Sequence, residues 1–119
     1  MRFDHIEAHV GDINRYCEFL KNLFEGGSWK VISNSGTSMF TSPDGLNIEV
    51  KKRKVPTSPE MSGFCNPCLR RPAPKDFITG LGLTIEKGLS TPSGMVYFFK
   101  DHEGVTWHIK DLPEEGAAE

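Results

Sequence analysis

The amino-acid sequence predicts an α+β domain made of two copies of one βαβββ module, and three observations support this fold class. The segment "DGLNIEVK" at 44–51 reappears as "EGVTWHIK" at 103–110, displaced by 59 positions in a chain of 119 residues. The segments around both copies alternate apolar and polar residues, which is typical of strands. One stretch near the N-terminus repeats apolar residues at three- and four-residue spacing, which indicates an amphipathic helix.

The first module is predicted over residues 1–54. Its first strand spans 3–10, and Asp12 is a suitable N-cap for a helix over 13–25 that a Gly-Gly pair ends. We expect the apolar face of this helix to pack on the outer face of the sheet. That face consists of Tyr16, Leu20, Leu23 and Phe24, and the three further strands are predicted at 29–33, 37–42 and 46–52.

The second module is predicted over residues 64–111, between a linker at 55–63 and a C-terminal tail at 112–119. The linker is recognised by its Pro, Ser and Gly content. Pro67 has no backbone N–H to donate, so the opening segment at 64–71 is expected at a sheet edge or a bulge. A short helix is predicted at 73–82, and strands are predicted at 83–89, 95–99 and 105–110.

The charge and composition of the chain argue against several classes of protein. The 14 basic and 16 acidic residues give a net charge of −2, which is not the electrostatic footprint of a nucleic-acid-binding protein. No stretch is long and apolar enough to span a bilayer, and the N-terminus has no apolar signal segment. Three cysteines are an odd count that fits a reducing compartment. We therefore expect a cytoplasmic protein without nucleic-acid or membrane partners.

The polar faces of the predicted strands carry the residues with chemical potential. The centre of the repeated segment holds Glu49 in the first copy and His108 in the second, on the side opposite the apolar residues. The first strand adds His5, Glu7 and His9 on a single face. Imidazole and carboxylate groups together suit a divalent first-row metal. The alternative is that these faces are polar because they meet water, as in most antiparallel sheets.

Three segments in this order resemble the vicinal oxygen chelate superfamily: "FDHIEAHVGD" at 3–12, "NIEV" at 47–50 and "FFKDHEGVTWHI" at 98–109. This superfamily includes glyoxalase I, methylmalonyl-CoA epimerase, extradiol dioxygenases, and the fosfomycin and bleomycin resistance proteins. The resemblance covers residues 2–111. It implies two βαβββ modules whose mixed sheets curl into a cup around a metal ion, and it implies a symmetric homodimer.

The resemblance also implies a ligand set. The metal ligands of the superfamily fall on His5, Glu49 and His108, although glyoxalases usually have Glu at the last position. The fourth ligand, usually His, falls on Asn66, whose amide oxygen is a weak or water-mediated contact for such an ion. The implied cofactor is a divalent ion, namely Ni, Co, Zn, Mn or Fe. His9 and Arg70 are expected to line the substrate site.

The function implied is that of a metal-dependent lyase, isomerase or epimerase acting on a small substrate with vicinal oxygens. In such an enzyme the ion stabilises an enediolate while a side chain moves a proton, and Glu7 and His108 are the expected acid–base groups. One alternative is a metal-free protein that binds a small molecule, as bleomycin resistance proteins do. A second alternative is an Fe(II) dioxygenase, although those members carry the carboxylate ligand on the last strand.

Overall fold

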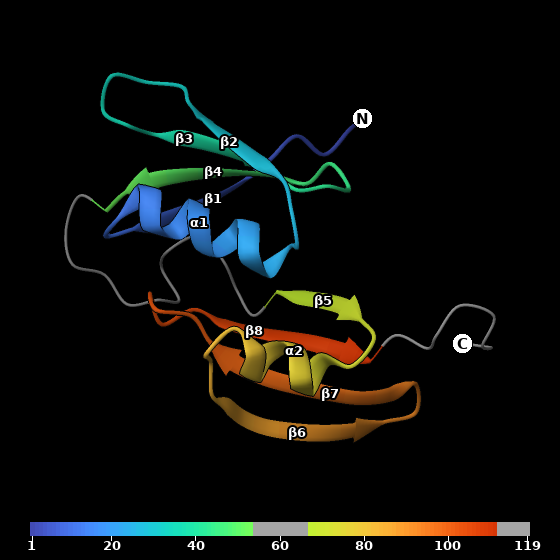
Figure 1. Ribbon diagram of the computed structural model, residues 1–119. Coiled ribbons are helices and arrows are strands. Elements are labelled where there is room, and N and C mark those ends of the chain that lie inside the picture. Colours follow the sequence, from blue (N-terminus) through green and yellow to red (C-terminus); the bar gives the residue numbers. More distant parts are fainter. Residues whose placement is uncertain (54–66, 112–119) are drawn as a thin grey trace. The chain divides into compact units, whose positions relative to one another are not determined.

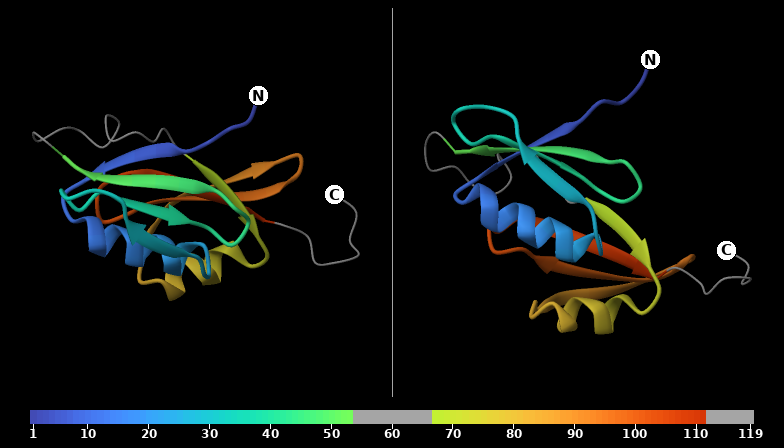
Figure 2. Two further views of the ribbon diagram at one scale, coloured as in Figure 1. Left: turned by 90° about the horizontal axis from the view of Figure 1, so that it is seen from above. Right: turned by 45° about the horizontal axis from the view of Figure 1, so that its top comes forward.

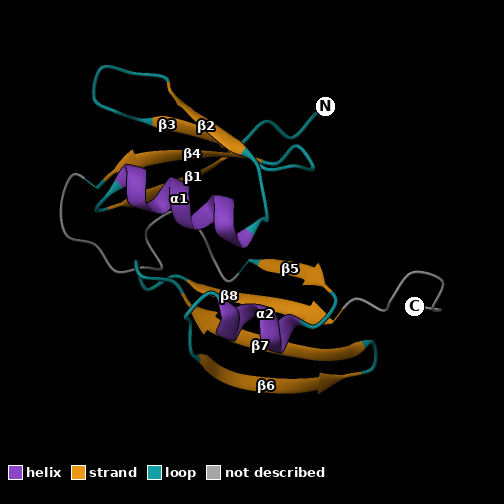
Figure 3. Ribbon diagram, viewed as in Figure 1, coloured by secondary structure: helices purple, strands orange, loops and turns teal. Residues whose placement is uncertain are grey.

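The computed structural model of the protein describes residues 1–53 and 67–111, and it divides into two compact units at 1–64 and 65–119. Each unit contains one βαβββ module (Figure 1). Strands make up most of both modules, and each has one helix (Figure 3). The predicted βαβββ order is therefore confirmed. The predicted linker and tail, and Asn66, lie outside the described residues.

The first module is a four-stranded mixed sheet with one helix. Its strand order is β1-β4-β3-β2, in which β1 is parallel to β4 and the other neighbours are antiparallel. Every element predicted from the sequence is present. The bounds are β1 Ile6–Val10, α1 Ile13–Leu23, β2 Ser28–Val31, β3 Ser38–Thr41 and β4 Asn47–Lys52.

Helix α1 begins where the sequence predicted and ends two residues earlier. The Asp12 side chain accepts a hydrogen bond of 3.1 Å from the Arg15 N–H and so caps the first turn. The chain leaves the helix because Glu25 and Gly26 have φ angles of 56° and 140°, outside the helical region. The helix packs on β3 and β4, along one face of the sheet (Figure 2). Its buried residues are Tyr16, Cys17, Leu20 and Leu23.

The second module repeats this arrangement with the strand order β5-β8-β7-β6. Strand β5 lies at the edge of its sheet, as expected from the missing N–H of Pro67. The Pro67 carbonyl accepts a hydrogen bond of 3.0 Å from the His108 N–H. Among the described residues, neither helix is long and apolar enough to cross a membrane. The bounds are β5 Cys68–Arg71, α2 Pro74–Gly80, β6 Ile85–Thr91, β7 Gly94–Lys100 and β8 Thr106–Asp111.

The sequence repeat is also a repeat of strand register. Phe40 lies opposite Ile48 in the first sheet, and the residues 59 positions later, Phe99 and Trp107, lie opposite each other in the second. All four side chains are buried. Glu49 and His108 therefore occupy equivalent positions in the two modules. Their partners on the adjacent parallel strand are Glu7 and Cys68 respectively.

A buried polar residue supports the turn before the last strand of each module. Ser42 and Asp101 stand at the same repeat position and are 4% and 5% exposed. The Ser42 N–H donates to the Leu46 carbonyl at 2.9 Å, and the Asp101 N–H donates to the Val105 carbonyl at 3.0 Å. Both turns therefore have the same backbone hydrogen bond, although the buried side chains differ.

The Asp101 carboxylate accepts three hydrogen bonds. Its Oδ1 accepts from the N–H groups of Glu103 and Val105, at 2.9 and 3.0 Å. Its Oδ2 accepts from Trp107 Nε1 at 2.9 Å. Trp107 is 1% exposed and is the largest fully buried side chain of residues 1–53 and 67–111. The carboxylate therefore joins the turn to the core of the second module, and it needs all three donors because a buried charge without partners is costly.

We predict that Asp101→Asn lowers the free energy of unfolding by about 1.5–3 kcal/mol, the range for hydrogen bonds to a charged group. An amide can still accept from the two backbone donors, but its NH₂ then faces the Trp107 N–H, so two donors meet. Urea unfolding followed by tryptophan fluorescence measures the change. Asp111→Asn, at the exposed end of β8, is the control. Equal midpoints for the two variants would contradict the assigned role.

Candidate functional site

The polar face of strands β1 and β4 holds a cluster of ionisable side chains that contact one another. The two strands are parallel, with Glu7 opposite Glu49 and His9 opposite Lys51. Side chains alternate across a strand, so these residues share one face while their neighbours lie on the other. The neighbours Ala8, Val10, Ile48 and Val50 are fully buried. Burial of that apolar face fixes which side chains line the polar face.

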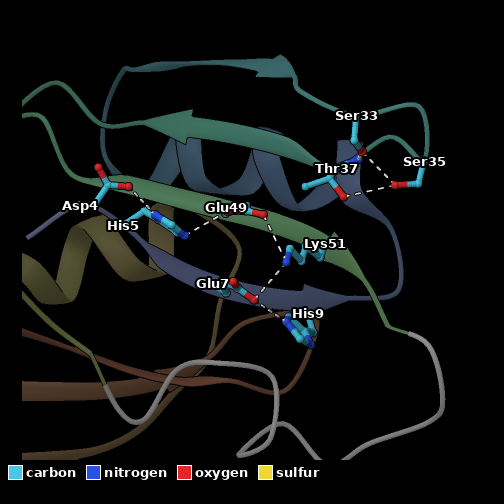
Figure 4. Close-up of polar contacts among 9 residues, drawn as sticks. All are labelled: Asp4, His5, Glu7, His9, Ser33, Ser35, Thr37, Glu49 and Lys51. Atoms are coloured by element: carbon cyan, nitrogen blue, oxygen red, sulfur yellow. Dashed lines mark hydrogen bonds and ion pairs between the residues drawn. The ribbon is translucent and has the colours of Figure 1, made fainter.

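Three side chains on this face come close enough to hold one ion. His5, Glu7 and Glu49 each offer a ligand atom, and these atoms lie within 4.8 Å of one another (Figure 4). The ring Nε2 of His5 is 3.0 Å from Oε2 of Glu49. The Glu49 side chain is 15% exposed, that of His5 30% and that of Glu7 41%. One imidazole and two carboxylates form a donor set suited to a divalent first-row metal.

Each ring nitrogen of His5 contacts a carboxylate. Its Nδ1 lies 2.6 Å from the Asp4 carboxylate, on the opposite edge of the ring from Glu49. The Asp4 carbonyl in turn accepts a hydrogen bond of 3.3 Å from the Asn47 side chain. The hydrogen bond with Asp4 raises the pKa of His5, and the charge of Glu49 adds to this effect. A carboxylate on the distal nitrogen of a histidine is the arrangement that orients metal ligands.

The ammonium of Lys51 contacts both carboxylates. Its Nζ lies 3.3 Å from Glu49 Oε1 and 3.4 Å from Glu7 Oε1. His9 Nε2 also contacts Glu7 Oε1, at 3.1 Å. The hydrogen bond from His9 lowers the pKa of Glu7, and the hydrogen bond to Glu49 raises the pKa of Lys51. The Glu7 carboxylate and the Lys51 ammonium are therefore charged at physiological pH.

His108 lies in the second module at the position equivalent to Glu49. Its ring stacks on that of Phe98, its partner on β7, with centroids 4.9 Å apart and planes at 22°. Burial lowers the pKa of His108. The imidazole is consequently neutral at neutral pH, which is the form that binds a metal.

The sheet face that carries His108 is basic. Arg70 and Lys110 are register partners on this face, one on β5 and the other on β8. Lys87 Nζ lies over the Phe98 ring, 4.7 Å from its centroid. No acidic residue of β5, β7 or β8 shares this face, because Asp111 has the opposite parity, and on β6 Glu86 lies at the register shift before Lys87. The face therefore suits a small anion next to an aromatic surface.

The structure groups some of the predicted site residues. His5, Glu7 and Glu49 come together in the first module, and His9 joins them through Glu7. His108 and Arg70 belong to the second module, and Asn66 lies outside the described residues. Sequence reasoning expected Glu7 to move protons, and the structure places its carboxylate among the ligand atoms. Sequence reasoning missed Asp4 and Lys51, although Lys51 closes the first copy of the repeat with the parity of Glu49.

No family model matches the chain, and no curated protein matches its sequence. Solved structures do match. FosX, a fosfomycin resistance protein from Listeria monocytogenes, aligns with a TM-score of 0.71 at 18% identity, over 97% of this chain and 96% of FosX. A glyoxylase/bleomycin resistance protein/dioxygenase domain from Frankia sp. EAN1pec aligns at 0.70 and 13% identity, over 95% and 98% of the two chains. The oxidase ChaP-H2 aligns at 0.65 and 13% identity, over 99% and 98%.

At these identities the likeness establishes the fold. The matches span nearly the whole of both chains, and they join the two modules in one chain as here. The fold implied by the resemblance in the sequence is confirmed: the chain has the paired βαβββ arrangement of these fosfomycin resistance and glyoxylase/bleomycin resistance/dioxygenase structures.

Proposed function

We propose that the protein is a divalent-metal-dependent lyase, isomerase or epimerase acting on a small anionic substrate with vicinal oxygens. The observation that carries this proposal is the convergence of His5, Glu7 and Glu49, with ligand atoms within 4.8 Å, on one partly buried sheet face. A divalent ion held there supplies Lewis-acid polarisation of the substrate oxygens. The symmetric homodimer expected from the sequence is part of the proposal.

The residues have distinct proposed roles. His5 and Glu49 are ligands, because they are the least exposed donors and Asp4 already orients the His5 ring. His108 is proposed as a ligand from the second module, because it has the repeat position of Glu49. Glu7 is the proposed base because it is more exposed than the two ligands and its carboxylate, ionised at neutral pH, can accept a proton. His9, which contacts Glu7 Oε1, orients that carboxylate.

A structural neighbour supports the choice of ion and substrate class. A variant of FosX from Listeria monocytogenes, 19% identical to this chain with a TM-score of 0.71, has been solved with Mn(II) and 1S,2S-dihydroxypropylphosphonic acid. That ligand has vicinal hydroxyls beside an anionic phosphonate. The basic face formed by Arg70, Lys110 and Lys87 in this protein is complementary to such an anion. Mn(II) and this phosphonate are therefore suitable probes of metal and substrate binding.

A metal-free protein that binds a small molecule is the second candidate. The observation that favours it is Lys51, whose ammonium contacts both carboxylates and so partly neutralises them without an ion. The presence of Asn66 where the superfamily usually has His also favours it. Metal-binding measurements separate the two candidates.

We predict about one Mn(II) bound per chain in protein stripped with EDTA and then dialysed against Mn(II), measured by elemental analysis. Glu49→Gln and His108→Ala are each expected to weaken Mn(II) binding by at least about tenfold, because ligand loss costs no less than loss of an orienting group. Glu7→Gln is expected to keep the ion and lose turnover. His102→Ala, in an exposed turn, is the control. If His108→Ala binds Mn(II) as tightly as the control, His108 is not a ligand.

The pH dependence of Mn(II) binding follows from His5. A ligand histidine must be deprotonated, and the pKa of His5 lies above its ordinary value of 6.5 because of Asp4. Occupancy is therefore expected to fall as the pH drops through this raised pKa, starting above the usual histidine range. Asp4→Asn removes the main cause, so its loss of Mn(II) should occur at lower pH. An electron paramagnetic resonance titration of free Mn(II) measures both curves relative to their high-pH plateaus.

The matched control for this titration is Asp76→Asn, which removes one negative charge from helix α2 of the second module. Its curve should coincide with that of the wild type. Identical midpoints for Asp4→Asn and Asp76→Asn would show that Asp4 does not control the protonation of the metal ligand.

The basic face predicts which substitutions weaken substrate binding. Arg70→Gln and Lys110→Gln are each expected to raise the Kd of Mn(II)-loaded protein for 1S,2S-dihydroxypropylphosphonic acid by about tenfold, equivalent to about 1.4 kcal/mol for one charged contact. Lys75→Gln, an exposed position on α2, removes the same charge and should have little effect. Isothermal titration calorimetry gives the constants. An equal change in all three variants would mean that only net charge matters.

A further inference from the structure

Lys51 stands where it can interact with both carboxylates of the candidate metal site. It follows Glu49 by two residues on β4, so the two side chains share a face. Its Nζ lies 3.3 Å from Glu49 and 3.4 Å from Glu7, and the Lys51 side chain is 38% exposed. Each contact uses Oε1 of the carboxylate, whereas His5 contacts Oε2 of Glu49. The ammonium thus bridges the two anionic members of the donor set.

An ammonium in this position and a divalent ion exclude each other. The Lys51 ammonium lies 3.3 and 3.4 Å from an oxygen of Glu49 and of Glu7, so an ion bound beside these carboxylates would be close to it and the two cations would repel each other. Lysine has a flexible four-carbon stem, so its ammonium can move into solvent when the stem changes rotamer. The two carboxylates also repel each other, and the Lys51 ammonium offsets this repulsion when no ion is bound.

We propose that Lys51 is a tethered competitor for the metal: its ammonium bridges Glu7 and Glu49 in the metal-free protein and must leave before a divalent ion binds. This inference rests on the proposed function, because it concerns the same metal site. It makes Lys51 a determinant of metal affinity, and it gives the carboxylate pair a cationic partner in the absence of an ion.

The adjacent residue offers a matched control. Lys52 has the opposite parity on β4, and its Nζ donates to the Gly11 carbonyl rather than to a carboxylate. Lys51→Met and Lys52→Met therefore remove the same charge from neighbouring positions while keeping an unbranched stem of similar length. Lys51→Arg retains a cation that can bridge the two carboxylates. These three variants separate the bridging contact from the net charge.

The experiment measures Mn(II) affinity by electron paramagnetic resonance and the melting temperature in EDTA, in the full-length protein. Lys51→Met is expected to bind Mn(II) roughly threefold to tenfold tighter than Lys52→Met, because two partly exposed ion pairs no longer oppose the ion. Lys51→Arg should bind no tighter than the wild type. In EDTA, the melting temperature of Lys51→Met should be lower than that of Lys52→Met. Saturating Mn(II) should reduce this difference in melting temperature.

Each of the remaining results would contradict one part of the proposal. Equal Mn(II) affinity in Lys51→Met and Lys52→Met would show that Lys51 does not compete, while the proposed metal site would stand. Weaker binding in Lys51→Met would mean that Lys51 helps to hold the ion, which reverses the inference. The absence of Mn(II) binding in the wild type and in every variant would overturn the proposed function and this inference with it.

Discussion

The parallel pairing of β1 with β4 is the constraint on which the candidate site depends. It places Glu7 opposite Glu49 and His9 opposite Lys51, and the fully buried Ala8 on the other face prevents a shift of register. A shift by one residue would exchange the two faces and bury the charged side chains. The hydrophobic core of the first module therefore determines which donor atoms meet, and the chemistry of the polar face follows from the packing of the apolar face.

The duplicated module supports two different kinds of surface. Equivalent positions carry Glu7 and Glu49 in the first module and Cys68 and His108 in the second. The first face combines carboxylates with imidazoles and one ammonium, whereas the second combines an imidazole with arginine and lysine around Phe98. In the proposed function the two faces have different roles. The face of the first module supplies most of the metal ligands, and the face of the second module attracts the anionic substrate.

The sequence was sufficient to predict the modules and the shared face of the site residues. The offset of 59 positions reappears as equal strand register, since Phe40 pairs with Ile48 as Phe99 pairs with Trp107. A period of two likewise predicted that Glu49 lies opposite the apolar side of its strand. Both predictions rest on backbone geometry, which short-range patterns report well.

Other features depend on local backbone and side-chain conformation, which the spacing of apolar and polar residues does not reveal. The apolar spacing of α1 continues to Phe24, but Glu25 adopts a left-handed conformation and the helix ends. Asp4 and His5 contact each other although they are neighbours in sequence, because both precede β1 and strict alternation does not apply there. The direction of the Lys51 ammonium depends on the rotamer of a flexible stem, so the sequence predicted its face and not its partners.

The most direct test of the account is whether a histidine nitrogen binds an ion at this site. Electron spin echo envelope modulation of Mn(II)-loaded protein detects nitrogen coupled to the ion. The account predicts imidazole modulation in the wild type that is reduced in His5→Gln and unchanged in His102→Gln. Bound Mn(II) without any nitrogen modulation, or with a modulation unaffected by His5→Gln, would contradict the assignment of His5 as a ligand.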